Sequence, residues 1–266
     1  TGAVSYAMKC AGKAVTYNDN LAFNHQIGLA LIENSSVTLS DADIADIVTP
    51  QPGVVHGDFI ERTFAGVYFT DDENRWLDVA VASIGRLQDS ARRALAWFAL
   101  CQSAMTKRPY NLFHRRNLYM RIADVPRTFG NKATWDRPFQ EHFTAFAAEA
   151  NRAVIDTGVA CHARCGDAAE APGRFDLVYL DPPYINASGL GVDYRAFYHF
   201  LEGLLRYQDW DGLIDRTSRH LELHREAAGW TDPELFLELL AALVARHEGS
   251  VIALSYRTDG LPAIDD

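Results

Sequence analysis

The sequence has few cysteines, no long hydrophobic run and no excess of positive charge. Its four cysteines, Cys10, Cys101, Cys161 and Cys165, are too sparse for a disulfide framework, which indicates a reducing compartment. No stretch approaches the roughly 18 apolar residues of a membrane span, and no basic and then apolar leader opens the chain. We therefore expect a cytoplasmic protein with no membrane partner.

Internal repeats and low-complexity tracts are also absent. With 266 residues, the chain is long enough for one large domain, or one domain carrying an inserted subdomain. The run Cys161-His162-x-x-Cys165 would provide half of a zinc site. No second Cys/His pair follows it at the spacing of a zinc finger. These residues are therefore expected to be ordinary thiols and an imidazole, and no metal is predicted.

The net charge of −10, taken as an average, argues against a nucleic-acid partner because phosphate contacts need Lys and Arg. The charge is unevenly distributed, however. Residues 107–137 contain eight Lys and Arg against two Asp, a local charge of +6, which leaves −16 for the rest of the chain. A basic segment on an acidic body is typical of a localised surface for a polyanion.

The most informative stretch is Asp181-Pro182-Pro183-Tyr184, which follows the apolar run of residues 175–180. Such a run predicts a buried strand, and open α/β sheets bind ligands at the carboxyl ends of their strands. Two prolines stiffen the turn. A carboxylate and a freed carbonyl there can accept hydrogen bonds from a flat amine, while the ring of Tyr184 stacks on a heterocycle. The simpler alternative is that Asp181 caps the strand and the prolines end it.

This tetrapeptide resembles the catalytic motif of amino-methyltransferases that act on nucleic-acid bases, and its acidic first residue is most similar to the adenine-specific DNA enzymes of the Dam-like D12 class. The start of the chain resembles the cofactor-binding start of that class, in which Thr1 and Gly2 match the last two positions of Phe-x-Gly-x-Gly. Gly166-Asp167 matches the Gly-Asp step before the catalytic strand. The resemblance implies S-adenosylmethionine as the cofactor. It also implies a Rossmann-like α/β sheet with helices on both faces and an inserted, mostly helical target-recognition subdomain.

Several residues are expected to contact that cofactor. Residues 3–12 read as a helix after the glycine turn, and residues 14–17 as a strand that ends just before Asp19. In a doubly wound sheet, an acidic residue at the end of the second strand reaches the ribose hydroxyls. The alternative is an ordinary loop carboxylate. Gly2 would permit a close backbone approach, and the resemblance places Asp167 near the adenine ring of the cofactor.

Nearly 150 residues separate the two predicted cofactor carboxylates, far more than a βαβ unit needs. We therefore predict an inserted target-recognition subdomain over residues 41–151, and a catalytic domain over residues 1–40 and 152–266. Part of the insertion interleaves cations with aromatic residues and amides, which are suited to phosphates and base edges. The predicted DNA-binding residues are Arg115, Arg116, Asn117, Arg121 and Lys132. The alternative is a solvated helix face.

Helical spacing of apolar residues predicts further helices over 21–34, in two segments between 72 and 104, over 141–155, from 194 onward and over 233–245. Residues 251–256 read as a second buried strand. Compared with the D12 class, the chain looks truncated at both ends. We expect a fragment that lacks the first strand and the last two strands.

The predicted reaction is transfer of a methyl group from S-adenosylmethionine to the exocyclic N6 amine of adenine in a specific double-stranded DNA sequence. A restriction-modification or related system is the expected setting, with a cognate restriction endonuclease as a candidate partner. The amine would donate hydrogen bonds to the Asp181 carboxylate and the Pro182 carbonyl, and the flipped adenine would stack on Tyr184. Two alternatives remain: the same residues methylate cytosine N4, RNA adenine or a protein glutamine amide, or the chain binds DNA without catalysis.

Overall fold

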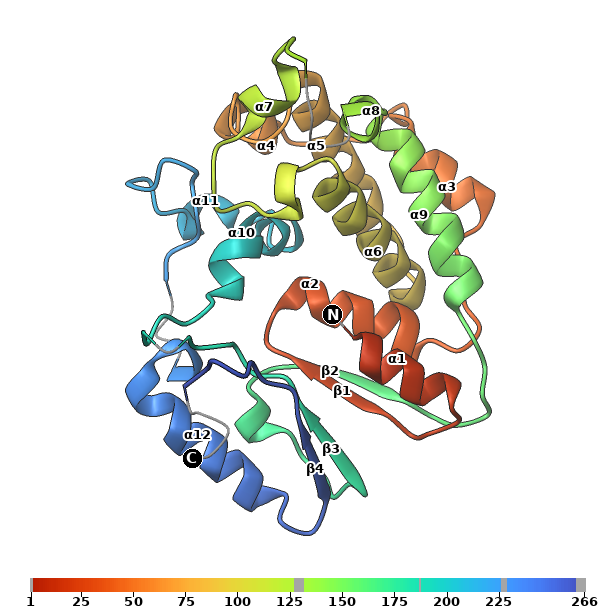
Figure 1. Cartoon of the computed structure of the whole chain (residues 1–266). Coiled ribbons are helices and arrows are strands. Elements are labelled where there is room, and N and C mark those ends of the chain that lie inside the picture. The colour runs from red at the N-terminus through yellow and green to blue at the C-terminus, as the bar shows by residue number, and fades with distance from the viewer. Residues whose placement is uncertain (1, 127–131, 187, 226–228, 262–266) are drawn as a thin grey trace.

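The computed structural model describes residues 2–126, 132–186, 188–225 and 229–261, and Thr1, a predicted cofactor residue, lies outside them. The described part has a mixed α/β fold with many helices and four short strands (Figure 1). The strands are β1 (Thr16–Asp19), β2 (His162–Cys165), β3 (Leu177–Leu180) and β4 (Val251–Leu254). The α-helices are α1 (Ala3–Cys10), α2 (Ala22–Ile27), α3 (Asp41–Val48), α4 (Phe59–Thr63), α5 (Asp71–Gly85), α6 (Ser90–Thr106), α7 (Leu118–Ile122), α8 (Lys132–Asp136), α9 (Phe139–Ala153), α10 (Tyr194–Leu205), α11 (Trp210–Leu213) and α12 (Pro233–Arg246). Shorter helical segments are η1 (Gly28–Glu33), η2 (Pro109–Asn111), η3 (Ala168–Glu170) and η4 (Gly229–Thr231).

The predicted helices and strands are present, but the prediction that β3 and β4 are buried is wrong, because Tyr179 is 40% exposed and Val251 is 64% exposed. Local sequence signals explain where several of the elements begin. Helix α3 starts with a capping box, because the Ser40 hydroxyl accepts from the backbone N–H of Asp43 at 3.1 Å and the Asp43 carboxylate accepts from Ser40 N at 2.8 Å. Thr70 and Glu73 form the same arrangement at the start of α5. None of the described helices has the length and apolar character needed to cross a membrane.

The strands lie in two parallel pairs, and the single Rossmann-like sheet stays a prediction. Strand β1 pairs with β2, so that Asp19 lies opposite Cys165, and β3 pairs with β4, so that Leu180 lies opposite Leu254. Among the described residues, no ladder joins one pair to the other. Both pairs are connected by long helical crossovers, as parallel strands require.

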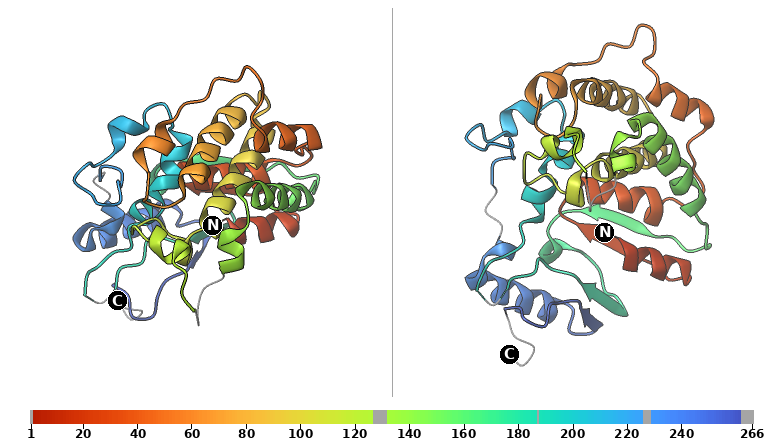
Figure 2. Two further views of the ribbon diagram at one scale, coloured as in Figure 1. Left: turned by 90° about the horizontal axis from the view of Figure 1, so that it is seen from above. Right: turned by 45° about the horizontal axis from the view of Figure 1, so that its top comes forward.

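Helical segments pack against part of each strand pair. Helix α12 lies along β3–β4, and Figure 2 shows this part of the molecule set apart from the orange-to-green helices. The β1–β2 pair packs against η1, and the closest approach is at Gly28. A Cβ atom added to Gly28 would lie 2.5 Å from a ring carbon of Tyr17 and 2.9 Å from the Cβ of Ala163, so a larger residue would push the helix off the strands.

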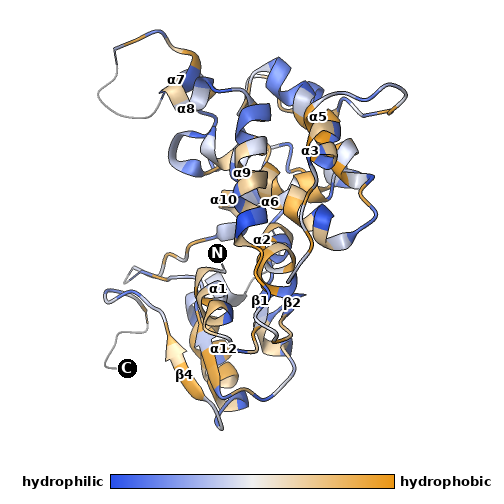
Figure 3. Ribbon diagram, turned by 90° about the vertical axis from the view of Figure 1, so that its right-hand side faces the viewer, coloured by the Kyte–Doolittle hydropathy of each residue, from blue (hydrophilic) through white to orange (hydrophobic). Residues whose placement is uncertain are grey.

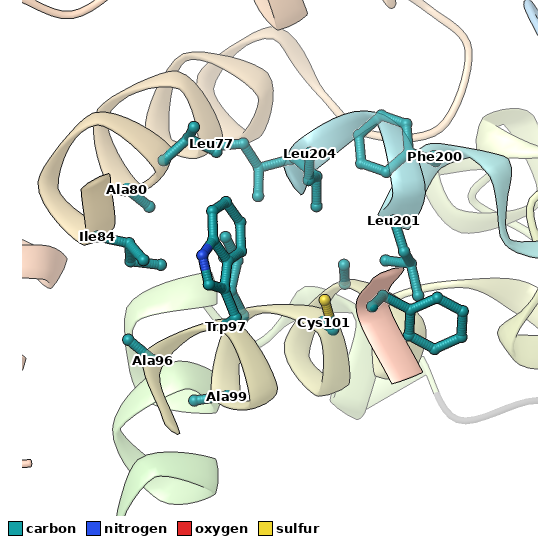
Figure 4. Packing of buried hydrophobic residues seen from close by; sticks show 14 of the residues in the cluster. Leu77, Ala80, Ile84, Ala96, Trp97, Ala99, Cys101, Phe200, Leu201 and Leu204 are labelled. Carbon is teal, nitrogen blue, oxygen red and sulfur yellow. The ribbon is translucent and has the colours of Figure 1, made fainter. Parts of the chain in front are cut away.

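The main hydrophobic core lies among the helices. Trp97 of α6 is enclosed by α5 and α10, with Leu77 and Leu204 among its neighbours (Figure 4). The core also holds fully buried aromatic rings, of which Phe113 and Phe200 stack with centroids 5.0 Å apart. This cluster takes residues from both sides of the predicted domain boundaries at 40 and 152. The division into a catalytic domain and an insertion stays a prediction.

A polar junction ties four segments together inside this core. The Tyr68 hydroxyl lies 2.7 Å from Nε2 of His199 and 2.7 Å from the carbonyl oxygen of His220, and it also contacts the Phe113 carbonyl. Burial lowers the pKa of His199 to about 3. The imidazole is therefore neutral at physiological pH, and the junction is held by hydrogen bonds between neutral groups.

Candidate active site

The predicted catalytic residues lie where the paired strands β3 and β4 end. Asp181 directly follows β3, and Ser255 directly follows β4. The backbone N–H of Ser255 donates to the carbonyl of Leu180 at 2.8 Å, which carries the strand pairing up to the first residue of the motif. Residues distant in the sequence therefore meet at one edge, as the position of Asp181 at the end of a strand predicted.

The Tyr184 side chain turns back onto this edge. Its hydroxyl donates to Oδ1 of Asp181 at 3.1 Å and lies 3.2 Å from Oγ of Ser255. Asp181 is exposed, whereas Pro182, Pro183 and Tyr184 are half-buried. The motif thus presents one accessible carboxylate beside a partly accessible ring.

Tyr256 packs against the Tyr184 ring. The two rings meet edge to face, with centroids 5.6 Å apart and an interplanar angle of 88°. Tyr256 itself is held by three contacts. Its hydroxyl accepts from the backbone N–H of Ile185 at 3.1 Å and donates to the Leu261 carbonyl at 2.7 Å, and its ring stacks on Phe236. The position of Tyr184 is therefore set by packing as well as by its own hydroxyl.

Tyr194, at the start of α10, belongs to the same edge. Burial raises the pKa of its phenol, and the neighbouring Tyr184 and Asp181 raise it further because a second negative charge is disfavoured there. Helix α10 is positioned by Asp193, whose carboxylate accepts from the backbone N–H of Ala196 at 2.9 Å. The sequence predicts an aromatic helix here that resembles the segment flanking both ligands in the D12 class, but Tyr194 is not among the predicted site residues.

The predicted cofactor carboxylate Asp19 ends β1, as expected. Its Oδ1 accepts from the backbone N–H of Leu21 at 2.9 Å, and its Oδ2 accepts from the Tyr17 hydroxyl at 3.1 Å and the Asn24 amide at 3.0 Å. Burial raises the pKa of Asp19, and these hydrogen bonds oppose the rise. Asp19 therefore shapes the turn into α2 and retains limited capacity for a further donor.

Asp167 lies beside Asp19 at the end of the neighbouring strand. The backbone N–H of Gly166 donates to the Asp19 carbonyl at 3.0 Å, which joins the two turns. Asp167 is exposed, and its Oδ1 caps η3 by accepting from Ala169 N at 2.8 Å; the Trp230 indole also donates to it at 3.3 Å. The structure therefore joins the turns that carry two carboxylates 148 positions apart in the sequence.

Gly2 forms the turn into α1. It has φ 72° and ψ 2°, a left-handed conformation that favours glycine, and its carbonyl accepts from the backbone N–H of Tyr6 at 2.8 Å. This matches the glycine turn predicted before the first helix. Thr1, predicted to act with Gly2, lies outside the described residues.

Glu202 links helix α10 to the start of helix α2, and it was not among the predicted site residues. The carboxylate is buried and accepts from the backbone N–H of Phe23 at 2.9 Å, at the start of α2. Helix α2 has no side-chain cap of its own, so Glu202 serves that purpose from another helix. Burial raises the pKa of Glu202. A glutamate inside an apolar helical stretch is the only sequence signal for it.

The five predicted DNA-binding residues fall into two groups. Arg115, Arg116 and Lys132 are exposed, and Lys132 pairs with Asp136 at 2.8 Å. Asn117 and Arg121 are instead buried. A DNA contact by any of the five stays a prediction, and the structure offers the exposed group for it.

Arg121 is buried because it takes part in an internal ion-pair network. It binds both carboxylate oxygens of Glu73, at 2.9 and 2.7 Å, and Lys107 binds the same carboxylate at 2.9 Å. Arg108 is also buried and lies over the Tyr68 ring, 4.3 Å from its centroid. Three cations counted toward the basic segment are thus used inside the fold, and its described surface is less basic than the sequence indicated.

No group of three or more His, Cys, Asp or Glu side chains in the described ranges is arranged to hold a metal ion. Within the Cys161-His162-x-x-Cys165 run, Cys161 is buried and its thiol contacts the Lys13 carbonyl at 3.6 Å, whereas Cys165 is exposed at the end of β2.

The chain is similar to a known methyltransferase. The chain is 29% identical, over 208 residues, to "Type II methyltransferase M2.HphI" of Haemophilus parahaemolyticus, an alignment that covers 76% of this chain and 60% of that protein. The chain therefore spans less than two thirds of the length of this relative. No solved structure matches the chain. The family model described as D12 class N6 adenine-specific DNA methyltransferase matches residues 1–227, and the chain belongs to that family.

Proposed function

We propose that this protein transfers a methyl group from S-adenosylmethionine to the N6 amine of adenine in double-stranded DNA. The observation that carries the proposal is the edge formed by the ends of β3 and β4. There an exposed Asp181 carboxylate lies within hydrogen-bond distance of the Tyr184 hydroxyl. Family membership supports the same chemistry.

The residues near β1 and β2 suit the proposed cofactor. Gly2 provides a backbone turn without a side chain at the start of α1, and Asp19 and Asp167 provide two carboxylates at adjacent strand ends. Asp19 would take the ribose hydroxyls and Asp167 would lie near the adenine ring, with Thr1 next to the glycine turn. Bound S-adenosylmethionine supplies a methyl group already activated on a sulfonium.

The acceptor amine is the difficult partner, because its lone pair is delocalised into the adenine ring. The two N–H groups of the amine would donate hydrogen bonds to the Asp181 carboxylate and the Pro182 carbonyl. These bonds would direct the nitrogen lone pair toward the methyl group. Pro182 restricts the backbone between the two acceptors, and Pro183 restricts the backbone directly after them. The proton released after methylation would pass to Asp181 or to solvent.

Adenine inside a duplex is out of reach, so the target nucleotide would be flipped out at a cost of a few kcal/mol. Stacking on the ring of Tyr184 would return ~1 to 3 kcal/mol of that cost. The ring is half-buried and braced by Tyr256, so it needs little ordering when the base arrives.

The finer architecture belongs to the same proposal. We infer that the two strand pairs are parts of one Rossmann-like sheet with helices on both faces, and that residues 41–151 form the target-recognition subdomain. Arg115, Arg116 and Lys132 would contact DNA directly, whereas the buried Asn117 and Arg121 would support that surface. The type II designation of the Haemophilus relative supports a restriction-modification setting with a cognate restriction endonuclease.

The test compares two aspartates at opposite ends of β3. Asp181→Asn removes the predicted acceptor charge, and Asp176→Asn changes an exposed aspartate at the start of the strand. We expect Asp181→Asn to lower methyl incorporation into unmethylated DNA about a hundredfold or more, and the control to keep wild-type activity. Chromatography of digested DNA and RNA would identify the methylated nucleoside. Methylcytosine, or a product in RNA or protein alone, would contradict the proposed substrate, as would an undiminished Asp181→Asn variant.

A further inference from the structure

The Tyr184 hydroxyl has a second neighbour that the proposed function does not use. Its oxygen lies between Oδ1 of Asp181 at 3.1 Å and Oγ of Ser255 at 3.2 Å. Ser255 belongs to the other strand of the pair, 71 positions further along the chain than Tyr184. A hydroxyl from β4 therefore contacts the side chain that contacts the carboxylate after β3.

Counting protons sets the direction of this chain of hydrogen bonds. A phenol has a single hydrogen, and an ionised carboxylate can only accept. If Tyr184 donated to Ser255, its oxygen lone pairs would face the Asp181 carboxylate at 3.1 Å, which is repulsive. The favourable arrangement has Ser255 donating to Tyr184 and Tyr184 donating to Asp181.

The two ends of this chain differ in how firmly they are held. Ser255 is fixed by the bond from its backbone N–H to the Leu180 carbonyl at 2.8 Å, immediately after the paired strands. Asp181 is exposed, and its carboxylate accepts a hydrogen bond from the Tyr184 hydroxyl. The fixed Ser255 can therefore restrict the orientation of the Tyr184 hydroxyl, and through it the orientation of the exposed Asp181 carboxylate.

We propose that Ser255 is a positioning residue that orients the Asp181 carboxylate through the Tyr184 hydroxyl. The inference rests on the proposed function. With Oδ1 engaged by Tyr184, Oδ2 remains available to accept the amine of the target base, and the carboxylate is held in one orientation before the base arrives. Ser255 itself touches neither substrate nor cofactor in this scheme.

The experiment uses Ser255→Ala, the conservative Ser255→Thr and a matched control at the other end of the same strand. The control is Ser250→Ala, which removes a hydroxyl that donates to the Phe175 carbonyl at 2.6 Å. We expect Ser255→Ala to lower kcat for DNA methylation about tenfold, the effect of weakening one hydrogen bond to a charged group, with KM for DNA changed less than about twofold. Ser255→Thr should restore most of the activity, and Ser250→Ala should leave it unchanged.

A double-mutant cycle tests the route through Tyr184. Tyr184→Phe keeps the ring and removes the hydroxyl, so Ser255→Ala should have no further effect in that background. Additive losses would overturn the proposal, as would unchanged kcat in Ser255→Ala or an equal loss in Ser250→Ala.

Crystal structures of wild-type protein and Ser255→Ala separate this inference from the proposed function. We expect one Asp181 orientation in contact with Tyr184 in the wild type and several orientations in the variant. If the wild type methylates no DNA, the proposed function fails, while the crystal structures still decide whether Ser255 orients Asp181. Identical carboxylate orientations in both structures would overturn the positioning role.

Discussion

The helical core and the β3–β4 layer differ in how they bury apolar side chains. We define the helical core as the buried cluster around Phe200, and the β3–β4 layer as strands β3 and β4 with α12. In the helical core, large rings such as Phe64 and Phe113 are fully buried. In the β3–β4 layer, Val251 is 64% exposed and Leu254 is 45% exposed, and β4 is coloured as hydrophobic in Figure 3.

The region that contributes most to stability is therefore not the region that carries the predicted catalytic residues. Hydrophobic stabilisation scales with the apolar area removed from water, so the helical core contributes most of it. The predicted catalytic residues lie instead at the end of the β3–β4 layer, and only the small cluster around Phe236 packs beneath them. Substitutions in the helical core should therefore cost more stability than substitutions in the β3–β4 layer.

Replacing Phe200 by Ala should destabilise the protein most. The ring is fully buried and contacts Phe64, Phe113 and Trp210 with centroids 5.0 to 5.2 Å away. Loss of burial and the remaining cavity should lower the free energy of unfolding by about 3 to 5 kcal/mol in urea titrations. A loss under about 1 kcal/mol would show that the helical core does not dominate stability.

Glu73→Gln should be the next most damaging change. The variant leaves Lys107 and Arg121 buried with less compensation, and breaking such a network costs about 3 kcal/mol. Burial opposes ionisation of Glu73, but Arg121 and Lys107 outweigh it and lower its pKa. The matched control is Asp72→Asn, whose side chain is 92% exposed in its pair with Arg75. Equal unfolding midpoints for the two variants in urea would contradict the prediction.

The neutral His199 predicts acid sensitivity of the helical core. Its pKa is about 3 in the folded protein and ~6.5 in the unfolded chain, so its contribution is fully present above pH 6.5. As the pH falls from about 6.5 toward 3, the unfolded chain binds the extra proton and stability declines by up to about 1.4 kcal/mol per pH unit. His199→Asn should flatten this slope in denaturation curves across pH. The exposed His56→Asn variant should keep it, and an unchanged slope in His199→Asn would refute the assignment.

Leu254→Ala should have the smallest effect. The side chain is already 45% exposed, so its truncation should change the free energy of unfolding by less than about 1 kcal/mol. Thermal denaturation of Leu254→Ala beside Phe200→Ala makes the comparison direct. Similar losses in the two variants would remove the distinction between the two regions.

Local sequence signals predicted the elements well, because each depends on a few neighbouring residues. The glycine turn at Gly2, the acid at the end of β1 and the motif after β3 were all placed correctly. The pairing of the strands was harder to predict from the sequence. Nothing in the four residues of β1 or β3 shows which partner they take, and the single sheet expected from the resemblance is two pairs in the described structure.

The roles of charged residues were the hardest to predict. Arg115 and Arg121 look alike in the sequence, yet one is exposed and the other is buried against Glu73. Glu202 was missed for the same reason, since its partner, the backbone N–H of Phe23, lies 179 positions away. Burial of a charge depends on a partner from another element, and adjacent residues do not reveal that partner.

The sequence by itself determined the chemistry offered at the strand end: an aspartate, two ring-constrained prolines and a tyrosine, whose covalent properties need no partner. The tertiary structure alone decided how these groups are oriented and which cations reach the surface. Both outcomes depend on hydrogen bonds and ion pairs between distant segments, such as Ser255 with Tyr184 and Glu73 with Arg121. These contacts form only when the chain has folded, because bringing their ends together costs entropy that the packed core must offset.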